Sequence, residues 1–225
     1  MEKITTNIKA IIFDMDGTII HTQKVWDEVT LAVLEQKGIV TLTDEDRQFL
    51  TTLVGMNLLY SSAALKQRFN IQDSVPDLVK QTALLANQKM ADQISFIEGF
   101  ESFHVKLQKN AIPTGVATNA SQENLAFIAQ KLNFQRFFGS NMYTPAHVNN
   151  KAKPDPALFL HTAQQLNVAP SECLVFEDSL YGFTAAREAG MKCIAVKNDQ
   201  NQHLLGYVHD AISTYHEAEA VLKKL

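Results

Sequence analysis

Two aspartates near the amino terminus have a spacing that suits covalent phosphate chemistry. Asp14 and Asp16 are separated by one residue and followed by Gly17. A carboxylate such as Asp14 can attack phosphorus and carry the phosphoryl group as an aspartyl-phosphate. A second carboxyl two residues away can protonate the leaving oxygen and later accept a proton from water. We therefore predict Asp14 as nucleophile and Asp16 as acid/base, with Gly17 allowing a sharp turn beside a bound anion.

Ligands for the phosphate are expected from two later stretches. The Thr118 hydroxyl, Asn119 and Lys153 can hold phosphate oxygens as charge redistributes during transfer. Such groups are needed because an anionic nucleophile and a phosphate repel each other by about 4 kcal/mol per pair of unit charges at about 4 Å, with an effective dielectric of about 20. Thr118 and Asn119 could also begin the next helix, a role compatible with phosphate binding. Two flanking prolines fix the following loop and favour Lys153 over the nearby Lys151.

A magnesium site is predicted from the remaining acids. Mg²⁺ prefers oxygen ligands, usually one or two carboxylates together with water and phosphate oxygens. Asp14, Asp16 (through its backbone) and Asp178 can supply them. Glu177 precedes Asp178, and adjacent side chains at a strand end point in opposite directions. Glu177 is therefore a less certain metal ligand than Asp178 and a candidate to support the metal ligands from behind, and the sequence does not decide whether it touches the metal.

Short apolar segments precede most of these residues and predict the strands of a parallel sheet. They span residues 8–13, 114–118, 173–176 and 193–196, and each ends at a polar or charged residue. Helical patterns alternate with them, with start signals at Ser121 and Pro156 and a stop signal at Gly190. This alternation predicts a doubly wound, Rossmann-like α/β domain, whose strands gather functional groups at their carboxyl ends.

Residues 19–93 show helical periodicity throughout and predict an inserted helical unit. Its expected helices span residues 25–37, 44–53, 58–69 and 76–91. The predicted core domain therefore comprises residues 1–18 and 94–225, and the predicted helical domain comprises residues 19–93. Trp26 and a stripe of valines at 25, 29 and 33 are expected in the interior of the helical unit. Gly55 and Asn57, in the loop at residues 54–57, are candidates for substrate selection.

Composition narrows the class of protein. The chain has 225 residues, of which 46% are apolar and 20% are charged, and its net charge is -4, so no cationic surface for nucleic acid is expected. Only Cys173 and Cys193 could give thiol chemistry, and no zinc-ligand spacing surrounds them. No apolar run is long enough for a membrane span or signal peptide, which predicts a cytoplasmic protein without a membrane partner. Nothing in the sequence indicates an oligomeric state.

Four motifs in order resemble the haloacid dehalogenase-like hydrolase superfamily, in the helical-cap branch of β-phosphoglucomutase-like phosphatases. The motifs are Asp14-Met15-Asp16-Gly17-Thr18, Val116-Ala117-Thr118-Asn119, Lys153-Pro154-Asp155-Pro156 and Phe176-Glu177-Asp178-Ser179. The resemblance implies a core of that family's type with the helical insert as its cap, and it implies the same roles for the acids, Thr118 and Lys153. Related sequences commonly carry an acidic residue shortly after the first motif. His21 stands in that region here, so it is a further candidate for facing the substrate.

The expected activity is Mg²⁺-dependent hydrolysis of a small phosphate monoester, a sugar phosphate or similar metabolite. A sugar phosphomutase would use the same core residues, but mutases of this branch resemble one another in an arginine shortly after the cap glycine, and residues 55–59 contain none. A dehalogenase would need neither a metal nor Asp16. A non-catalytic phosphate-binding module would have no use for two mutually repelling carboxylates at positions 14 and 16.

Overall fold

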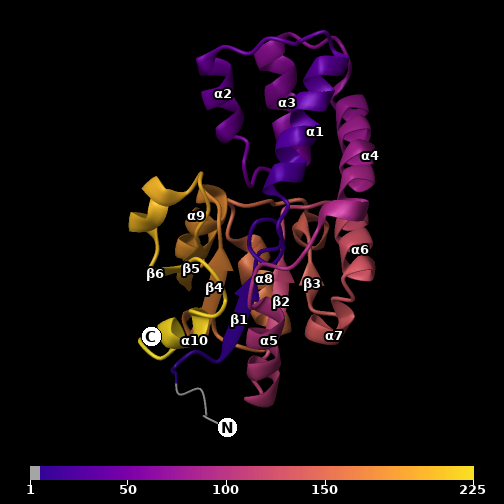
Figure 1. The fold of residues 1–225 in the computed structure, drawn as a ribbon. Helices are drawn as coiled ribbons and strands as arrows, with labels where there is room; N and C mark the ends of the chain where they lie inside the picture. The colour runs from indigo at the N-terminus through magenta and orange to yellow at the C-terminus, as the bar shows by residue number, and fades with distance from the viewer. Residues whose placement is uncertain (1–5) are drawn as a thin grey trace.

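A six-stranded parallel sheet forms the centre of the computed structural model, which describes residues 6–225 (Figure 1). Its spatial order is β3-β2-β1-β4-β5-β6, with every neighbouring pair parallel. The strands are β1 Ala10–Phe13, β2 Thr114–Ala117, β3 Met142–Tyr143, β4 Cys173–Glu177, β5 Lys192–Val196 and β6 Asp210–Ile212. The predicted α/β class with a parallel sheet is confirmed, and β3 and β6 are additions to the strands predicted from the sequence.

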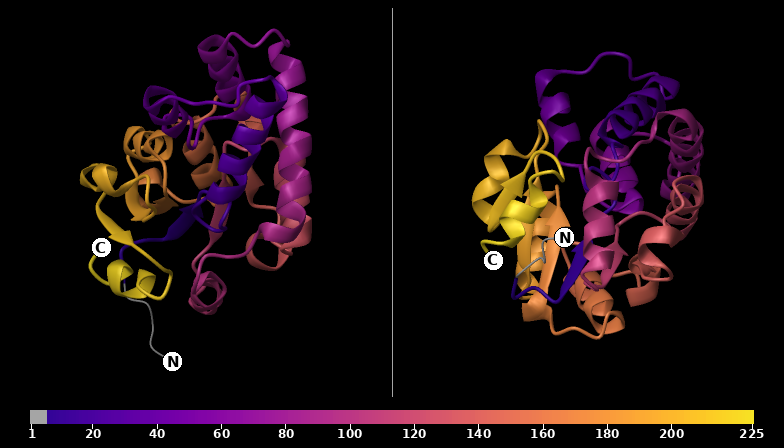
Figure 2. Two further views of the ribbon diagram at one scale, coloured as in Figure 1. Left: turned by 45° about the horizontal axis from the view of Figure 1, so that its top comes forward. Right: turned by 60° about the horizontal axis from the view of Figure 1, so that its bottom comes forward.

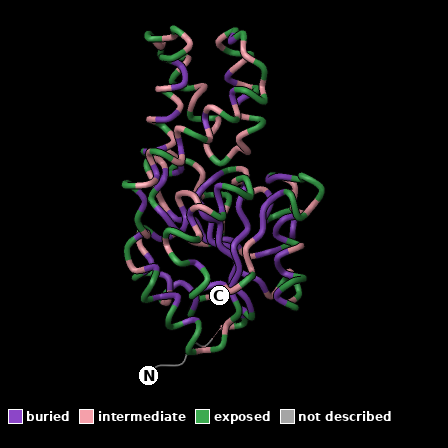
Figure 3. The backbone as a smooth tube through the Cα atoms, turned by 90° about the vertical axis from the view of Figure 1, so that its right-hand side faces the viewer, coloured by how far each residue is buried: buried purple, intermediate pink, exposed green. Residues whose placement is uncertain are grey.

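Helices cover both faces of this sheet, because alternate strand residues point to opposite sides. Ile11 and Phe13 belong to one buried cluster, which includes residues of α5, α6, α7 and α10. Ala10 and Ile12 belong to a second cluster with residues of α8 and α9. The helices are α5 Phe100–Lys109, α6 Gln122–Lys131, α7 Gln135–Phe138, α8 Ala157–Gln165, α9 Leu180–Glu188 and α10 Ala218–Leu222, with 3-10 turns at Pro145–Val148, Pro170–Glu172 and Gln202–Tyr207. The buried strands lie inside these layers (Figure 3).

Aromatic packing fixes the ends of the two central strands. Phe13 stacks on Phe176 with ring centroids 5.3 Å apart, and both rings are fully buried. The two residues are also partners in the β1–β4 register. Asp14 and Glu177 follow them directly in the chain, and the Asp14 backbone N–H donates to the Phe176 carbonyl at 3.0 Å. The rigid strand pair therefore sets the position of the acidic residues that come next.

Four helices, hereafter the cap, stand beyond the carboxyl ends of the strands (Figures 1 and 2). They are α1 Gln23–Gln36, α2 Asp44–Thr51, α3 Leu58–Phe69 and α4 Val75–Gln93. Side chains cap the starts of α2 and α4: Thr43 forms a capping box with Asp46, and Ser74 accepts the N–H of Asp77. Residues 33, 34, 65, 71 and 78 form a separate apolar cluster inside the cap.

Two adjacent segments join the cap to the sheet. Ile20 forms an isolated bridge with Phe96, and the His21 N–H donates to the Ser95 carbonyl at 2.9 Å. The exact domain limits at residues 18 and 94 stay a prediction, and the first five residues of the predicted core lie outside the described part. Within residues 6–225, no helix combines the length and apolarity needed to cross a membrane.

Candidate functional site

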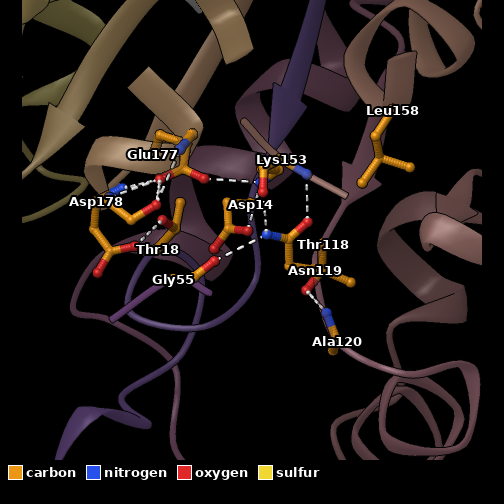
Figure 4. Close-up of polar contacts among 12 residues, drawn as sticks. Asp14, Thr18, Gly55, Thr118, Asn119, Ala120, Lys153, Leu158, Glu177 and Asp178 are labelled. Carbon is orange, nitrogen blue, oxygen red and sulfur yellow. Dashed lines mark hydrogen bonds and ion pairs between the residues drawn. The ribbon is translucent and has the colours of Figure 1, made fainter. Parts of the chain in front are cut away.

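The predicted catalytic residues converge at the carboxyl edge of the sheet (Figure 4). Asp14 follows β1, Thr118 follows β2, and Asp178 follows β4. Lys153 comes from the loop between β3 and α8, and its side chain reaches over this edge to Asp14. Strand order alone explains most of the convergence, because β2, β1 and β4 are neighbours in the sheet.

Lys153 is the buried cation of the site. Its Nζ lies 2.7 Å from Asp14 Oδ1 and 2.8 Å from Glu177 Oε1, and its side chain is 1% exposed. It also lies 4.6 Å from the centre of the Phe159 ring, a cation–π contact. Burial alone would lower the pKa of Lys153, but the two carboxylates outweigh it and hold the pKa above its usual value. The ammonium group is therefore charged at neutral pH.

Glu177 is held by four hydrogen-bond donors. Its Oε1 accepts from Lys153, and its Oε2 accepts the backbone N–H groups of Asp178 and Ser179, each at 2.7 Å, and the Ser179 hydroxyl at 3.0 Å. A Cβ at Gly182 would lie 1.8 Å from the carboxyl carbon of Glu177, so the first turn of α9 passes too close for any larger residue. Both oxygens of Glu177 are therefore engaged, which suits the supporting role predicted for it.

A buried group of carboxylates could hold a metal ion. Oxygens of Asp14, Glu177 and Asp178 lie within 4.8 Å of one another, and all three residues are buried. Burial, together with the neighbouring acids, raises the pKa of Asp14 to about 8 and the pKa of Asp178 well above its usual value, and Lys153 offsets this only partly. Three acids facing one lysine leave an excess of negative charge, which a hard cation with oxygen ligands would neutralise.

Asp178 is placed by its neighbours on three sides. Its Oδ1 accepts the Thr18 hydroxyl at 3.3 Å, and its Oδ2 accepts the Asn198 amide at 3.0 Å. A Cβ at Gly17 would lie 2.2 Å from Asp178 Oδ2, and the φ of Gly17 is +74°. Gly17 is thus required by both its backbone conformation and its contact with this carboxylate. Asn198 is a site residue that no sequence signal indicated, since it follows β5 in a loop without a motif.

Asp16 points to the cap rather than to the carboxylate group. Its Oδ1 accepts the indole N–H of Trp26, on α1, at 3.0 Å. Burial raises the pKa of Asp16, although the hydrogen bond from Trp26 and the nearby Thr22 lower it in part. Trp26 packs against the apolar cluster that includes Val25 and Val29, but it is only half-buried and also contacts Asp16, so its expected place in the interior is confirmed only in part. Val25, Val29 and Val33 are buried as predicted. The side chain of Asp16 is not in the group that could hold a metal, so its predicted backbone contact stays a prediction.

Thr118 and Asn119 occupy different surroundings. Both are buried, and Thr118 Oγ1 accepts the N–H of Ala120 at 3.1 Å while the residue lines the cleft. The Asn119 amide nitrogen donates to the Gly55 carbonyl at 2.9 Å and to the Lys153 carbonyl at 3.2 Å. Both amide N–H groups are thus directed at backbone carbonyls. Asn119 also lines the cleft, and the phosphate contact predicted for this residue stays a prediction.

A cleft of about 350 Å³ lies between the sheet edge and the cap. Asp14, Asp16, Thr118 and Asp178 line its floor. The cap contributes mainly apolar walls, from residues that include Leu31, Leu50, Leu53, Met56 and Leu58. Arg47 on α2 is the only lysine or arginine among the lining residues of the described chain.

The three cap residues predicted to select the substrate have different positions. Gly55 lines the cleft. Asn57 does not; it caps α3 through the Leu59 N–H and donates to the Asn119 carbonyl at 3.0 Å. His21 is exposed and is not among the residues that line the cleft within residues 6–225. Its predicted contact with the substrate has no support from this geometry.

Comparison with known proteins identifies similar sequences and folds. A sequence model described as haloacid dehalogenase-like hydrolase matches residues 11–196. The putative phosphatase YhcW of Bacillus subtilis is 28% identical over 192 residues, which cover 85% of this chain and 84% of that protein. The phosphorylated carbohydrates phosphatase of Thermotoga maritima is 26% identical over 187 residues, which cover 83% of this chain and 84% of that one.

Solved structures share the fold over nearly the whole chain. A HAD hydrolase of family IA, variant 3, from Entamoeba histolytica superposes with a TM-score of 0.82 at 22% identity, covering 97% of this chain and 100% of the other. A putative beta-phosphoglucomutase from Thermotoga maritima superposes with a TM-score of 0.73 at 26% identity, with the same coverage.

Proposed function

The chain belongs to the haloacid dehalogenase-like hydrolase family, and we propose that it is a Mg²⁺-dependent phosphatase that hydrolyses a small phosphate monoester through an aspartyl-phosphate on Asp14. The observation that carries the proposal is the position of Asp14. It lies on the floor of a cleft, with Lys153 2.7 Å from one of its oxygens and Asp178 in the same carboxylate group. The similarity to named phosphatases supports the same reaction class.

In the proposed first step, a carboxylate oxygen of Asp14 forms a bond to phosphorus while the bond from phosphorus to the ester oxygen breaks. Asp16 donates its proton to the departing oxygen, so that an alcohol leaves rather than an alkoxide. Its raised pKa favours the protonated form that this step requires. Lys153 and the Thr118 hydroxyl are proposed to hold equatorial oxygens of the phosphoryl group.

In the proposed second step, water attacks the phosphorus of the aspartyl-phosphate, and the bond to the Asp14 oxygen breaks. Asp16, now a carboxylate, takes the proton from this water. Inorganic phosphate leaves, Asp14 is regenerated as a carboxylate, and the proton from water replaces the one that Asp16 gave to the alcohol. The two steps together consume one water and return both acids to their starting state.

Asp14 and Asp178 would hold Mg²⁺, with a backbone oxygen of Asp16 as the third protein ligand. When bound, the ion neutralises charge on the phosphate and on the carboxylate group. The fit rests on the buried excess of negative charge at this edge of the sheet, which Lys153 alone does not balance.

A panel of phosphorylated metabolites tests the proposal. We expect the wild-type protein to release inorganic phosphate from at least one member in the presence of Mg²⁺, and EDTA and Asp14→Asn each to abolish release. The proposal is wrong if the wild-type protein and Asp14→Asn are equally inactive on every member.

A sugar phosphomutase is the second candidate, because the fold is shared with a putative beta-phosphoglucomutase. Residues 56–58, which follow the cap glycine, supply a hydrogen bond to Asn119 and a helix cap but no cation. Formation of an isomer from a sugar 1-phosphate without net release of phosphate would favour the mutase over the phosphatase.

A further inference from the structure

The side chain of Asn119 connects the cap to the loop that carries Lys153. Its amide nitrogen donates to the Gly55 carbonyl in the cap and to the Lys153 carbonyl, and its amide oxygen accepts the Lys153 backbone N–H at 2.8 Å. Asn119 is 8% exposed, so water has little access to replace these partners. One amide therefore holds both backbone polar groups of Lys153 and, at the same time, a carbonyl of the cap (Figure 4).

The cap loop at residues 52–57 lies directly against the core. The Asn57 amide donates to the Asn119 carbonyl at 3.0 Å, and the Tyr181 hydroxyl donates to the Thr52 carbonyl at 3.3 Å. The φ of Gly55 is +75°, and a Cβ there would lie 2.4 Å from the Cβ of Ser179. Only glycine permits both this backbone conformation and this approach, so Gly55 is the point at which the loop docks.

Lys153 is at the other end of the same hydrogen-bond chain. Its Nζ contacts Asp14 and Glu177 at 2.7 and 2.8 Å, and both of its backbone polar groups are bonded to Asn119. Any rotation of the Asn119 amide therefore releases the backbone of the residue that carries the ammonium group. The cap loop supplies one of the two acceptors that keep the amide in place.

We infer that Asn119 is a positioning residue that couples docking of residues 52–57 to the placement of Lys153 beside Asp14; its catalytic consequence rests on the proposed phosphatase function. With the loop docked, the Asn119 amide has all three partners. With the loop withdrawn, the side-chain amide loses its acceptor on Gly55. The backbone carbonyl of Asn119 also loses the hydrogen bond from Asn57. The amide then no longer holds Lys153 firmly. The lysine is fully placed only when the cap covers the cleft.

Hydrogen exchange at the Lys153 backbone amide tests this coupling without reference to activity. We expect Gly55→Ala, which keeps the loop from docking, to speed exchange at this amide by about tenfold, because its acceptor on Asn119 becomes mobile. Asn119→Ala should speed it at least as much. Gly38→Ala is the matched control: Gly38 is also in the cap with a φ of +80°, but a Cβ there meets nothing within 4 Å. It should change exchange at Lys153 by less than about twofold.

The variant Asn57→Asp gives an independent check that does not strain the backbone. It keeps an acceptor for the Leu59 N–H, and hence the cap of α3, but loses the donor to the Asn119 carbonyl. We expect faster exchange at Lys153 and, in turnover assays, a lower kcat with little change in KM, because the ammonium group acts on the transition state.

Two results would overturn the inference. One is wild-type exchange at Lys153 in Asn119→Ala. The other is wild-type exchange at Lys153 in Gly55→Ala or Asn57→Asp when exchange in residues 52–57 shows that the loop has left the core. Failure of the phosphatase proposal is separate, since it is seen as a wild-type protein that releases no phosphate while the exchange experiment still reports on the coupling.

Discussion

The indole N–H of Trp26 donates to Asp16 Oδ1 at 3.0 Å, which places a cap side chain on the proposed acid/base. The bond joins α1 to the turn after β1, so the orientation of Asp16 depends on the position of the cap. A donor that fixes one carboxyl oxygen leaves the other to exchange a proton with the substrate.

Trp26→Phe removes this donor and keeps an aromatic ring in place. We expect kcat to fall by about tenfold on alkyl phosphates, whose leaving oxygen needs a proton, because Asp16 is no longer oriented. On p-nitrophenyl phosphate, whose leaving group departs as a stable anion, the loss should be less than about twofold. Steady-state rates on the two substrate types measure the contrast, and equal losses on both would contradict the role of Trp26.

Arg47 is expected to bind a second negative charge on the substrate. It lines the cleft from α2, and it forms no ion pair within residues 6–225, whereas the adjacent acids at 45 and 46 pair with Arg68. Arg47→Gln should therefore lower kcat/KM for 6-phosphogluconate by about tenfold, through loss of a charge-assisted hydrogen bond. Glucitol 6-phosphate, which has a hydroxymethyl group in place of the carboxylate, should be almost unaffected.

The control for Arg47 is Arg187→Gln, on the surface of α9, where the arginine pairs with Glu188 and with no other acid in residues 6–225. This variant should leave kcat/KM unchanged for both 6-phosphogluconate and glucitol 6-phosphate. If Arg47→Gln lowered kcat/KM equally for the two six-carbon substrates, Arg47 would not bind the second negative charge.

Magnesium should stabilise the folded protein through Asp178. At a concentration of about 100 times its Kd, the ion should raise the melting temperature by roughly 5–10 °C, because it binds only the folded state. Asp178→Asn should lose this increase. In EDTA, the same variant should melt at or above the wild-type temperature, since it removes a buried acid whose pKa is raised by burial and by the neighbouring Glu177 and Asp14. Thermal scans with and without Mg²⁺ decide this, and a full Mg²⁺ effect in Asp178→Asn would exclude it as a ligand.

His104 should make the protein less stable in acid. It is fully buried on α5, with Nε2 2.8 Å from the Thr114 hydroxyl, and burial lowers its pKa from 6.5 to about 4. Below pH 6.5 the unfolded chain gains a proton that the folded protein excludes until about pH 4. The free energy of unfolding should therefore fall by about 2 kcal/mol between pH 7 and pH 5 from this residue, while above pH 7 it contributes no slope.

Urea unfolding at the two pH values measures this effect of His104. The double variant His104→Leu with Thr114→Val removes the imidazole together with its partner, and its loss between pH 7 and pH 5 should be smaller than the wild-type loss by about 2 kcal/mol. The same loss in both proteins would show that His104 is not the group responsible.

The sheet and the catalytic edge could be predicted because they depend on local patterns. Buried parallel strands are continuous apolar runs. Asp14 directly follows such a run, Thr118 ends one, and Asp178 lies two residues after one. The strands β3 and β6 could not be predicted, since they have only two and three residues, too few to show a hydrophobic pattern. The helix α5, whose N-cap is Gly99, was also missed.

The contacts between cap and core could not be predicted, because they join residues far apart in the chain. Asn119 lies 64 residues from Gly55 and 62 from Asn57. Its position after a strand suggested a phosphate ligand, whereas its side chain serves the cap and Lys153. The contact of Trp26 with Asp16 was missed for a similar reason: the helical stripe correctly buries Val25 and Val29, but it does not indicate what the indole N–H contacts outside the helix.

The most direct test of the account is whether the phosphoryl group is carried by Asp14. The protein should be mixed with Mg²⁺ and a phosphate ester that it hydrolyses, and the reaction quenched in acid within one turnover. The quenched protein is then digested and analysed by mass spectrometry. We predict that the peptide containing Asp14 gains the mass of one phosphoryl group, and that the corresponding peptide of Asp14→Asn does not. Release of phosphate by the wild-type protein with no phosphorylated peptide, or with the group on another residue, would contradict the account.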